Sequence, residues 1–382
     1  MSTITLSSRI VEPSTLKSAI SASSREVHEA DDPSSEQRQL ITADYLHYDA
    51  LYSVKGMPSH PVVMARGEGA FLWDLEGKRY IDFNAGFSAC NQGHCHPKIV
   101  AAMMRQCQQL TMPSRSVHVS QYAMFCRKIC ELTGFDKVAA MNGGAEAVDM
   151  AIKIARAWGY RCKGIEADKA IVLTASNNYH GRTLSILSAS TDESYRKNCG
   201  PWMPGVGAFC AGEEVRFGVI EDLERAFQKC GHQIAAYLIE PVQGHAGCLP
   251  ATDEYLIRVR ELCMKPDMVV IGKSLSGGLY PISAVLGTNE AMTSVDPGQY
   301  GSTFSGNPLA SAVAIAALDV IIDESLPARA KTLGDKFETR LRAIKSPYFD
   351  TVTGKVINED VMLEGVDILE KALNDLPAME EI

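Results

Sequence analysis

The chain has 382 residues, of which 46% are hydrophobic and 22% charged, a composition typical of a soluble globular protein. This length predicts one large domain with a smaller satellite rather than a single compact core. A formal net charge of -9 disfavours nucleic acid and anionic membrane surfaces as partners, and no apolar run is long enough to span a bilayer. A small metabolite is therefore the expected ligand.

The 11 cysteines lack paired CxxC spacing, and several lie in helical segments beside apolar neighbours. This pattern indicates reduced, buried thiols in an intracellular protein rather than a disulfide framework or a zinc site. His94 and His96 in "NQGHCHP" have no carboxylate or helical histidine spacing that completes a metal site. We therefore expect a structural role for both histidines and no bound metal.

Residues 1–40 are rich in serine and carry Arg9, Lys17 and Arg25, but acidic residues begin at Glu12. Mitochondrial import segments are basic amphipathic helices that are poor in acidic residues. We therefore expect a polar extension on a cytoplasmic protein rather than a matrix-targeting segment.

The first structured stretch is "GAFLWDLEGKRYIDF", whose alternation on both sides of residues 74–77 predicts a hairpin. Apolar spacing then predicts helices over "HPKIVAAMMRQCQQL" and "AMFCRKICELTG", the second ending at Gly134. A third helix is expected from Gly144 to Gly159.

Beyond this point β-rich runs alternate with helical ones. The strand-like runs are "AIVLTA", "AAYLIE" and "MVVIG", and "IEDLERAFQKC" and "YLIRVRELC" lie between them. Such alternation predicts an α/β fold with a mainly parallel sheet flanked by helices. From "NPLASAVAIAALDVI" onward the chain reads as helical.

Two stretches offer groups that suit a phosphate. In "MNGGAEAV" the glycines at a strand-to-helix junction let backbone N–H groups point at an anion near Gly144 and Ala145, or simply form a tight turn. In "YGSTFSGNP" the hydroxyls of Ser302 and Thr303 precede a helix, where they suit a phosphate oxygen or a helix cap.

Two further loops follow predicted strands. Tyr179, His180 and Arg182 come after "AIVLTA", where a ring can stack on a flat cofactor and a guanidinium can hold a carboxylate. Glu240 and His245 follow "AAYLI" and can orient a substrate or share its proton. Both loops also fit a solvated surface with incidental polar residues.

Lys273 ends the apolar run "MVVIG" and is followed by glycines. We expect its ammonium to be partly desolvated, which would free the amine for imine formation with an aldehyde. A lone lysine after a strand is ordinarily solvent-facing, so this interpretation depends on the neighbouring motifs.

Together these motifs, in this order, resemble the ornithine aminotransferases, a family of class III pyridoxal-phosphate aminotransferases with the fold type I architecture. The resemblance runs from about Asp44 to the C-terminus. The blocks that carry it are "FNAGFSACNQGHCHPKIV", "MNGGAEAVDMAIKIARAWGY", "NNYHGRTLSILSASTD", "IEPVQGHAG", "VVIGKSLSGGLYPISAVL" and "GSTFSGNPLASAVAIAALDV".

The resemblance implies a role for each matched residue. Lys273 would form the imine with pyridoxal phosphate and move the proton, Tyr179 would stack on the pyridine ring, and Arg182 would receive the substrate's α-carboxylate. The implied phosphate ligands are Gly144 and Ala145, with Ser302 and Thr303 from the neighbouring subunit of a homodimer. The implied domains are a small-domain segment at 41–95, a large cofactor-binding domain at 96–310 and an incomplete α+β C-terminal domain at 311–382.

The sequence also departs from the family pattern. Between "RELC" and "MKPDMVV" it lacks a strand and loop whose aspartate pairs with the pyridine nitrogen, and at "TVTGKVINED" it lacks a stretch with an active-site arginine. Among the substrate-binding positions, Glu240 is retained. His245 stands where the family has a glutamate, and Met57 and Phe87 stand where it has tyrosines.

The leading hypothesis is transfer of the δ-amino group of L-ornithine to 2-oxoglutarate or another 2-oxo acid, giving glutamate 5-semialdehyde and an amino acid. Met57, Phe87 and His245 favour an alternative, a paralogous aminotransferase acting on another amine or amino acid in a specialised biosynthetic pathway. A third hypothesis is a catalytically impaired relative that only binds the cofactor or a partner, because losing an interior strand opens a sheet.

Overall fold

The computed structural model describes residues 40–54, 56, 59–114, 116–263, 267–344, 366–369 and 371. The chain divides into two units, one of Met1–Met64 with Asp74–Glu76 and the other of Ala65–Trp73 with Gly77–Ile382. The domain boundaries expected at residues 95 and 310 stay predictions. The expected extension over residues 1–40 lies outside the described residues, except for Leu40.

The smaller unit contains one described helix, α2 (Thr42–Tyr52), which buries none of its side chains. The Asp44 carboxylate accepts a hydrogen bond from the Ile41 N–H at 2.9 Å and so closes the first turn. The Thr42 hydroxyl donates to Glu76 at 2.5 Å. These local polar contacts, rather than apolar burial, hold the helix start.

The predicted hairpin is confirmed. Strand β2 (Phe71–Asp74) pairs antiparallel with β3 (Arg79–Ile81), and β1 (Met64–Glu68) joins β2 on its other edge. Two aromatic rings of β2 each have an arginine against them. Arg79 lies 4.7 Å from the Phe71 ring centroid, and Arg66 lies 3.9 Å from that of Trp73.

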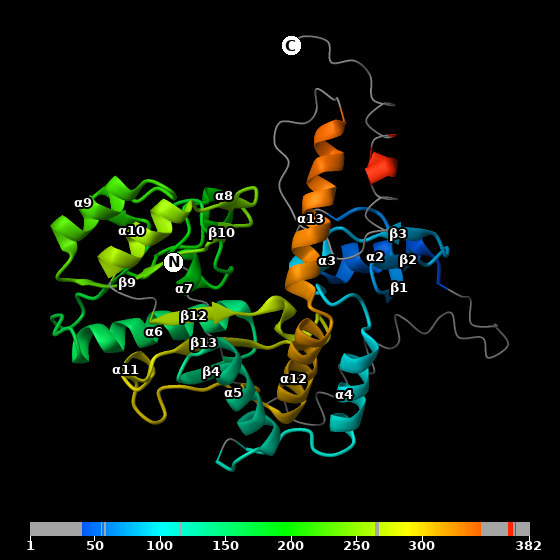
Figure 1. Cartoon of the computed structure of the whole chain (residues 1–382), viewed down its shortest axis with the longest axis horizontal. Coiled ribbons are helices and arrows are strands. Elements are labelled where there is room, and N and C mark those ends of the chain that lie inside the picture. The colour runs from blue at the N-terminus through cyan, green and yellow to red at the C-terminus, as the bar shows by residue number, and fades with distance from the viewer. Residues whose placement is uncertain are drawn as a thin grey trace, which may run out of the picture. The chain divides into compact units, whose positions relative to one another are not determined.

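Besides the sheet of β1, β2 and β3, the larger unit contains two three-stranded sheets (Figure 1). In one, β13 (Ser283–Gly287) lies between β12 (Met268–Ile271) and β4 (Lys137–Met141) and runs antiparallel to both. In the other, β5 (Ile171–Thr174) lies between β6 (Val206–Gly207) and β9 (Ile234–Leu238) and runs parallel to both. The expected parallel pairing is thus present, with β13 as the antiparallel member.

Strands β9 and β12 each pair on one side only among the described residues. The chain passes from the end of helix α10 (Asp253–Cys263) to the start of β12 with four intervening residues, of which 264–266 lie outside the described part. Four residues cannot form a further strand and its connection. The departure seen in the sequence at "RELCMKPDMVV" therefore coincides with the boundary between the two sheets.

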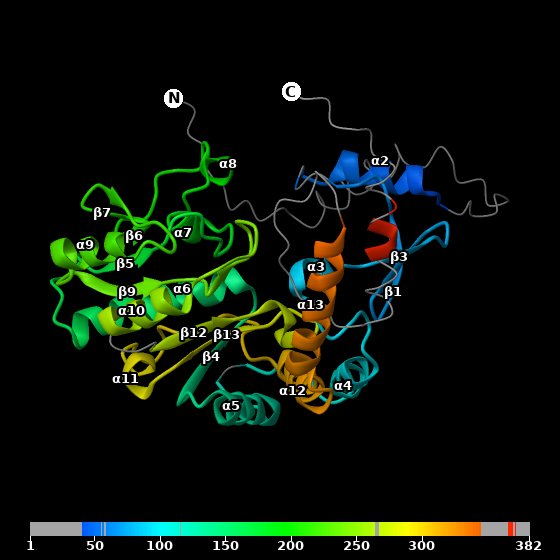
Figure 2. The ribbon, with the colours of Figure 1, turned by 45° about the horizontal axis from the view of Figure 1, so that its top comes forward.

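Helix α6 (Gly144–Arg161) packs on both sheets (Figure 2). Ala147, Ala151 and Ile154 belong to a buried cluster with Val285 of β13. The α6 residues Val148, Ile152 and Ala155 belong to another cluster. This cluster also contains Val172 of β5 and the partly buried Leu238 of β9 and Val270 of β12. One amphipathic helix therefore contributes apolar contacts to both sheets.

The predicted end of this helix at Gly159 is wrong, because α6 continues to Arg161. A Cβ at Gly159 would lie 2.9 Å from the Ala235 Cβ and 2.9 Å from Ile165 Cδ1. The glycine thus permits close approach of the helix to β9, and it does not terminate the helix.

The other predicted helices are confirmed as α4 (Pro97–Cys107), α5 (Ser120–Thr133), α9 (Ile220–Cys230) and α10. The helical C-terminal part begins with α12 (Pro308–Asp323) and α13 (Leu326–Ala343). Helix α12 packs against α4 and α5, with Val313 and Ala317 fully buried. Residues around the second sequence departure, 350–358, lie outside the described residues.

Short elements complete the unit. They are α3 (Ala85–Ser88), α7 (Leu184–Leu187), α8 (Glu193–Arg196), β7 (Phe209–Cys210), β8 (Glu213–Glu214), β10 (Val242–Gln243), β11 (Leu249–Pro250), η1 (Lys273–Ser276) and α11 (Asn289–Met292). Among the described helices, none combines the length and apolar character that crossing a bilayer requires. All 11 cysteines are free thiols.

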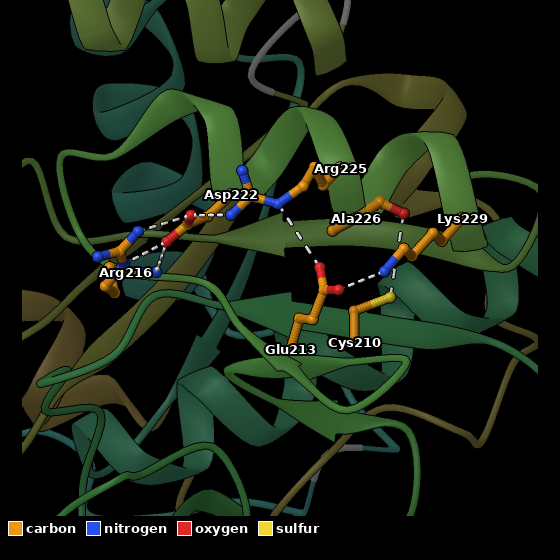
Figure 3. Close-up of polar contacts among 7 residues, drawn as sticks. All are labelled: Cys210, Glu213, Arg216, Asp222, Arg225, Ala226 and Lys229. Carbon is orange, nitrogen blue, oxygen red and sulfur yellow. Dashed lines mark hydrogen bonds and ion pairs between the residues drawn. The ribbon is translucent and has the colours of Figure 1, made fainter.

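A network of ion pairs and hydrogen bonds stabilises the first turn of α9 (Figure 3). Asp222 has a side chain only 1% exposed, and Arg216 binds it through Nε at 2.7 Å and Nη2 at 3.0 Å. The Arg216 N–H donates to the same carboxylate at 3.1 Å, and Arg225 contacts it as well. These donors, the Arg216 side chain foremost, lower the pKa of Asp222 to about 2.

We expect Asp222→Ala to lower the free energy of unfolding by about 2 kcal/mol at pH 7, because it leaves the two guanidinium groups without their buried acceptor. Urea unfolding measures the difference. Asp335→Ala is the matched control, since Asp335 forms an exposed pair with Lys331 at 2.8 Å and such pairs contribute about 0.5 kcal/mol or less.

The pH dependence follows from the sign of the pKa change. A carboxyl group whose pKa is lowered on folding stabilises the protein above its unfolded pKa of about 4 and loses this contribution as the pH falls to its folded pKa. The difference in unfolding free energy between wild type and Asp222→Ala should therefore shrink between pH 4 and pH 2. A difference that stays constant over this range would contradict the assignment.

We also expect hydrogen exchange to be faster along β9 and β12 than along β13, because about half of the amides in an edge strand face no partner. Exchange measured by mass spectrometry or NMR on peptides that cover these strands tests this expectation. Equal protection of β9, β12 and β13 would mean that the two facing edges are covered after all.

Candidate active site

Loops at the ends of four strands carry most of the predicted site residues. Strand β4 leads to Gly144, β5 to Tyr179, β9 to Glu240 and β12 to Lys273. The carboxyl ends of parallel strands form the usual ligand crevice of an α/β sheet. Several contacts show that these loops meet.

The turn before α6 leaves two backbone donors free. The Glu146 carboxylate accepts the N–H groups of Asn142 at 2.9 Å and Gly143 at 3.1 Å. The N–H groups of Gly144 and Ala145 have no partner among the described residues. Because they open an 18-residue helix, they combine free donors with the positive end of its dipole.

Lys273 follows β12 directly beside this turn. A Cβ at Gly272 would lie 3.8 Å from the Gly144 Cα, and the Ser283 hydroxyl of β13 donates to the Gly143 carbonyl at 2.7 Å. The backbone of Lys273 has a left-handed φ of 48°, which costs a non-glycine residue about 1 kcal/mol. Such local strain is a common mark of functional positions.

The expectation that the Lys273 ammonium is partly desolvated is wrong, because the residue is exposed. Its left-handed backbone turns the chain out of the strand line at this point. Among the described residues no hydrogen bond or ion pair engages its Nζ, although its charge acts on Glu240. The amine is therefore accessible and uncommitted.

The glycines after Lys273 make room for protein rather than for a ligand. A Cβ at Gly277 would lie 2.5 Å from Ile99 Cδ1, and one at Gly278 would lie 2.4 Å from the Cys90 sulfur. The Gln92 amide donates to the Ser274 carbonyl at 2.8 Å. These contacts fix the turn that presents Lys273.

Ser302 lies at the same end of α6 within one chain. Its hydroxyl accepts a hydrogen bond from the Asn142 amide at 2.9 Å. A cavity of about 390 Å³, lined by residues 112–114 and 300–303, opens beside it and includes Thr303. The structure thus places Ser302 next to the turn that carries Gly144, and Thr303 in the wall of the adjoining cavity.

The loop after β5 packs tightly on the first turn of α6. Gly181 has a φ of 129°, and a Cβ there would lie 2.7 Å from the Ala145 Cβ. Only a glycine allows this approach. The adjacent residues Tyr179 and Arg182 are thereby held near the free N–H groups of the turn.

Three rings and a guanidinium cluster beside this loop. The His245 ring lies 4.7 Å from the Tyr179 ring at 31°, and its Nε2 is 2.9 Å from the hydroxyl of Tyr195. The Arg182 guanidinium lies 4.2 Å from the Tyr195 ring centroid and 5.9 Å from that of Tyr179. His245 and Arg182 therefore both lie against the Tyr179 ring, which is an aromatic surface of the kind on which flat ligands stack.

Glu240 connects this cluster to Lys273. Its carboxylate accepts the Tyr179 N–H at 2.9 Å. Burial raises the pKa of the Glu240 carboxyl, and the Tyr179 N–H and the charges of Lys273 and His245 act in the opposite direction. Burial also lowers the pKa of His180 to about 4, so this imidazole stays neutral at pH 7.

Sequence reasoning missed Tyr195, Asn142 and Glu146. Tyr195 lies on the four-residue helix α8, which follows no strand and matches no motif. Glu146 did carry a signal, since a glutamate at the third position of a helix commonly accepts the N–H groups that precede the helix.

The two tyrosine replacements have different outcomes. Phe87 is 63% exposed and has a left-handed φ of 54° in α3. Met57 lies outside the described residues.

His94 and His96 each contact a carboxylate. His94 lies 2.7 Å from Asp82, and His96 lies 3.1 Å from Glu324. The described residues contain no cluster able to hold a metal ion.

These residues fit pyridoxal phosphate. Two free helix N–H groups and a hydroxyl suit its phosphate, an accessible amine suits its aldehyde, and the aromatic side chain of Tyr179 suits its ring. A Cβ at Gly143 or Gly144 would meet nothing within 4 Å, so there is space in front of the turn. The chain offers no aspartate from the absent strand for the ring nitrogen.

The family model described as aminotransferase class-III matches residues 52–265 and 264–372. The chain belongs to the class III aminotransferases, which confirms the predicted fold class, enzyme class and pyridoxal-phosphate cofactor. The two matched pieces overlap at residues 264–265, between the end of α10 at Cys263 and the start of β12 at Met268.

Within this class the chain is similar to ornithine aminotransferases. It is 43% identical to that of Emericella nidulans over 80% of this chain and 74% of the relative, and 38% identical to that of Schizosaccharomyces pombe over 84% and 91%. A Toxoplasma gondii ornithine aminotransferase structure matches with a TM-score of 0.79, 36% identity and coverage of 85% and 84%. An acetylornithine aminotransferase from Elizabethkingia anophelis also matches with a TM-score of 0.79, at 35% identity and coverage of 88% and 100%.

We expect Gly181→Ala to weaken pyridoxal-phosphate binding about tenfold, because the new methyl group pushes the Tyr179 loop away from Ala145. Titration of the apo-protein by absorbance measures this change. Gly218→Ala is the control: Gly218 also has a positive φ of 78°, but a Cβ there would meet nothing within 4 Å. Equal effects of the two substitutions would show that backbone strain, not the contact with Ala145, is responsible.

Proposed function

We propose that this chain transfers the δ-amino group of L-ornithine to a 2-oxo acid, 2-oxoglutarate in the first instance, giving glutamate 5-semialdehyde and an amino acid. The observation that supports this most directly is the accessible, uncommitted amine of Lys273 beside the α6 turn and within electrostatic reach of Glu240. The similarity to relatives named ornithine aminotransferases supports the substrate.

In this proposal the α6 turn binds the cofactor phosphate through Gly144 and Ala145, aided by Ser302 and Thr303. The Tyr179 ring stacks on the cofactor ring. Arg182 binds the α-carboxylate of ornithine, which leaves the δ-amino end directed at the reacting centre. Phe87 and His245 take the remaining substrate positions, and the position expected for Met57 lies outside the described residues.

When bound, pyridoxal phosphate supplies an electron sink for the carbon that loses its proton. The protein supplies the groups that move that proton and orient the substrate. The Lys273 Nζ can accept the proton from the substrate carbon and return it to another atom within its reach. The Glu240 carboxylate fixes the Tyr179 loop through the 2.9 Å bond and balances the positive charge of Lys273.

A second candidate is a paralogous aminotransferase that acts on another amine or amino acid. Its support is the similarity to an acetylornithine aminotransferase structure together with two residues that depart from the ornithine aminotransferase pattern, Phe87 and His245. Phe87 offers no hydroxyl, and the His245 imidazole offers no carboxylate. When a binding site recognises its substrate through hydrogen bonds, the loss of one hydrogen-bonding side chain changes its substrate preference strongly.

The homodimer and the cytoplasmic location belong to the same proposal. The cavity beside Ser302 and Thr303 opens to the surface of the described chain, and exposed apolar side chains such as Met112 and Phe304 lie next to those residues. A second copy covering this surface would bring its own hydroxyls near the cofactor site.

Curated relatives include an Arabidopsis thaliana protein named as mitochondrial, so cell fractionation is the test of location.

We expect purified protein with pyridoxal phosphate to show a visible absorbance band that Lys273→Ala abolishes, with at least a thousandfold loss of turnover. Lys331→Ala is the control, since Lys331 is exposed on α13. The aldehyde formed from ornithine and 2-oxoglutarate measures the reaction. A band with turnover of another amine but none of ornithine would favour the paralogue, and absence of any band in folded protein would contradict both enzyme proposals.

A further inference from the structure

Arg182 is an exposed cation without a fixed anionic partner. No hydrogen bond or ion pair engages its guanidinium among the described residues, and its one close contact is the Tyr195 ring, 4.2 Å from the guanidinium carbon. An arginine side chain loses up to about 2 kcal/mol of conformational freedom when it is immobilised. A ring that already holds the guanidinium removes part of that loss before a ligand arrives.

Tyr195 is itself held from two directions. Its hydroxyl lies 2.9 Å from His245 Nε2, and His245 packs on Tyr179 at 4.7 Å. This chain of contacts links α8 to the loop after β9 and to the loop after β5. The Tyr195 ring therefore has a defined place relative to Arg182.

The short helix α8 has additional anchors that fix the position of Tyr195. The Asp192 carboxylate accepts the Ser194 N–H at 2.8 Å and the Ser194 hydroxyl at 2.6 Å, which caps the helix. The Arg196 guanidinium lies 4.8 Å from the Trp202 ring centroid. These bonds engage the Asp192 carboxylate within α8, and it acts on Arg182 only through its charge. Among the described residues no ion pair therefore occupies the Arg182 guanidinium.

We propose that Tyr195 is a specificity-determining positioning residue, which holds Arg182 ready for a carboxylate and so selects amines that carry a carboxylate over simple amines. The inference rests on the proposed aminotransferase function. Tyr195 acts through its ring on Arg182, and its hydroxyl bond to His245 keeps the ring in place. The ligand class is thus an amino acid with a carboxylate several bonds from the reacting amine.

The test compares two probes of equal chain length, 5-aminopentanoate and pentylamine. Each is titrated into the protein loaded with pyridoxal phosphate, and the change in cofactor absorbance gives an apparent dissociation constant. The ratio of the two constants reports the carboxylate contribution alone. We expect Tyr195→Leu to reduce the preference for 5-aminopentanoate about tenfold and to leave the constant for pentylamine within about twofold.

Tyr195→Phe is the conservative variant, because it keeps the ring and removes only the bond to His245. It should retain most of the preference, within about threefold of the wild type. In an Arg182→Gln background, Tyr195→Leu should change the ratio no further, because the ring then has no guanidinium to hold. Tyr195→Ser provides the same comparison if the leucine variant is poorly folded.

The outcomes separate the two levels of inference. Equal constants for the two probes in the wild-type protein would contradict the carboxylate site and with it the proposed function. A wild-type preference that survives both Tyr195→Leu and Tyr195→Ser would overturn the role of Tyr195 alone. So would a loss of affinity that is equal for both probes, since that result indicates general loosening of α8.

Discussion

Helix α6 is the element on which the larger unit depends. Strands β9 and β12 are not paired with each other in the described chain, so backbone hydrogen bonds do not join the two sheets. Apolar side chains on α6 reach both sheets instead, among them Ile152 and Ile154, which are 4% and 0% exposed. Burying a side chain of this size contributes about 1.5–3 kcal/mol, so several along one helix can hold two sheets that share no strand pairing.

The same helix organises the site at its first turn. Its two free N–H groups suit an anion, and the loops that carry Tyr179, Lys273 and Ser302 reach this turn. The contact of Gly181 with Ala145 is one that a larger side chain would prevent. The chemistry therefore depends on small residues that carry no chemistry themselves. The packing of the two sheets and the position of Lys273 beside the first turn therefore both depend on α6.

Much of this could be predicted from the sequence because it depends on local signals. Strand-to-helix junctions with glycines, and polar residues directly after apolar runs, indicated Gly144, Glu240 and Lys273. The roles of those residues stay predictions, but the structure does bring them together. The family match confirms the class that the motifs implied. Other features depend on partners far apart in the chain. Gly159 matches the pattern of a helix terminator, but its contact with Ala235 gives it another role. The exposure of Lys273 follows from a backbone turn that the pattern of side chains does not encode. Tyr195 meets Arg182 and His245 only in three dimensions.

The unpaired edges of β9 and β12 have a consequence for how this protein behaves in a crowded solution. Most proteins keep unpaired strand edges at the periphery and protect them with charges, prolines or bulges. Here two such edges lie where α6 packs, in the middle of a large domain, and the β12 sequence Met-Val-Val-Ile carries no charge to discourage pairing. Strand exchange between molecules then competes with native folding, and its rate rises with protein concentration. The yield of folded protein should accordingly depend on how dilute the chain is kept while α6 and the sheets come together.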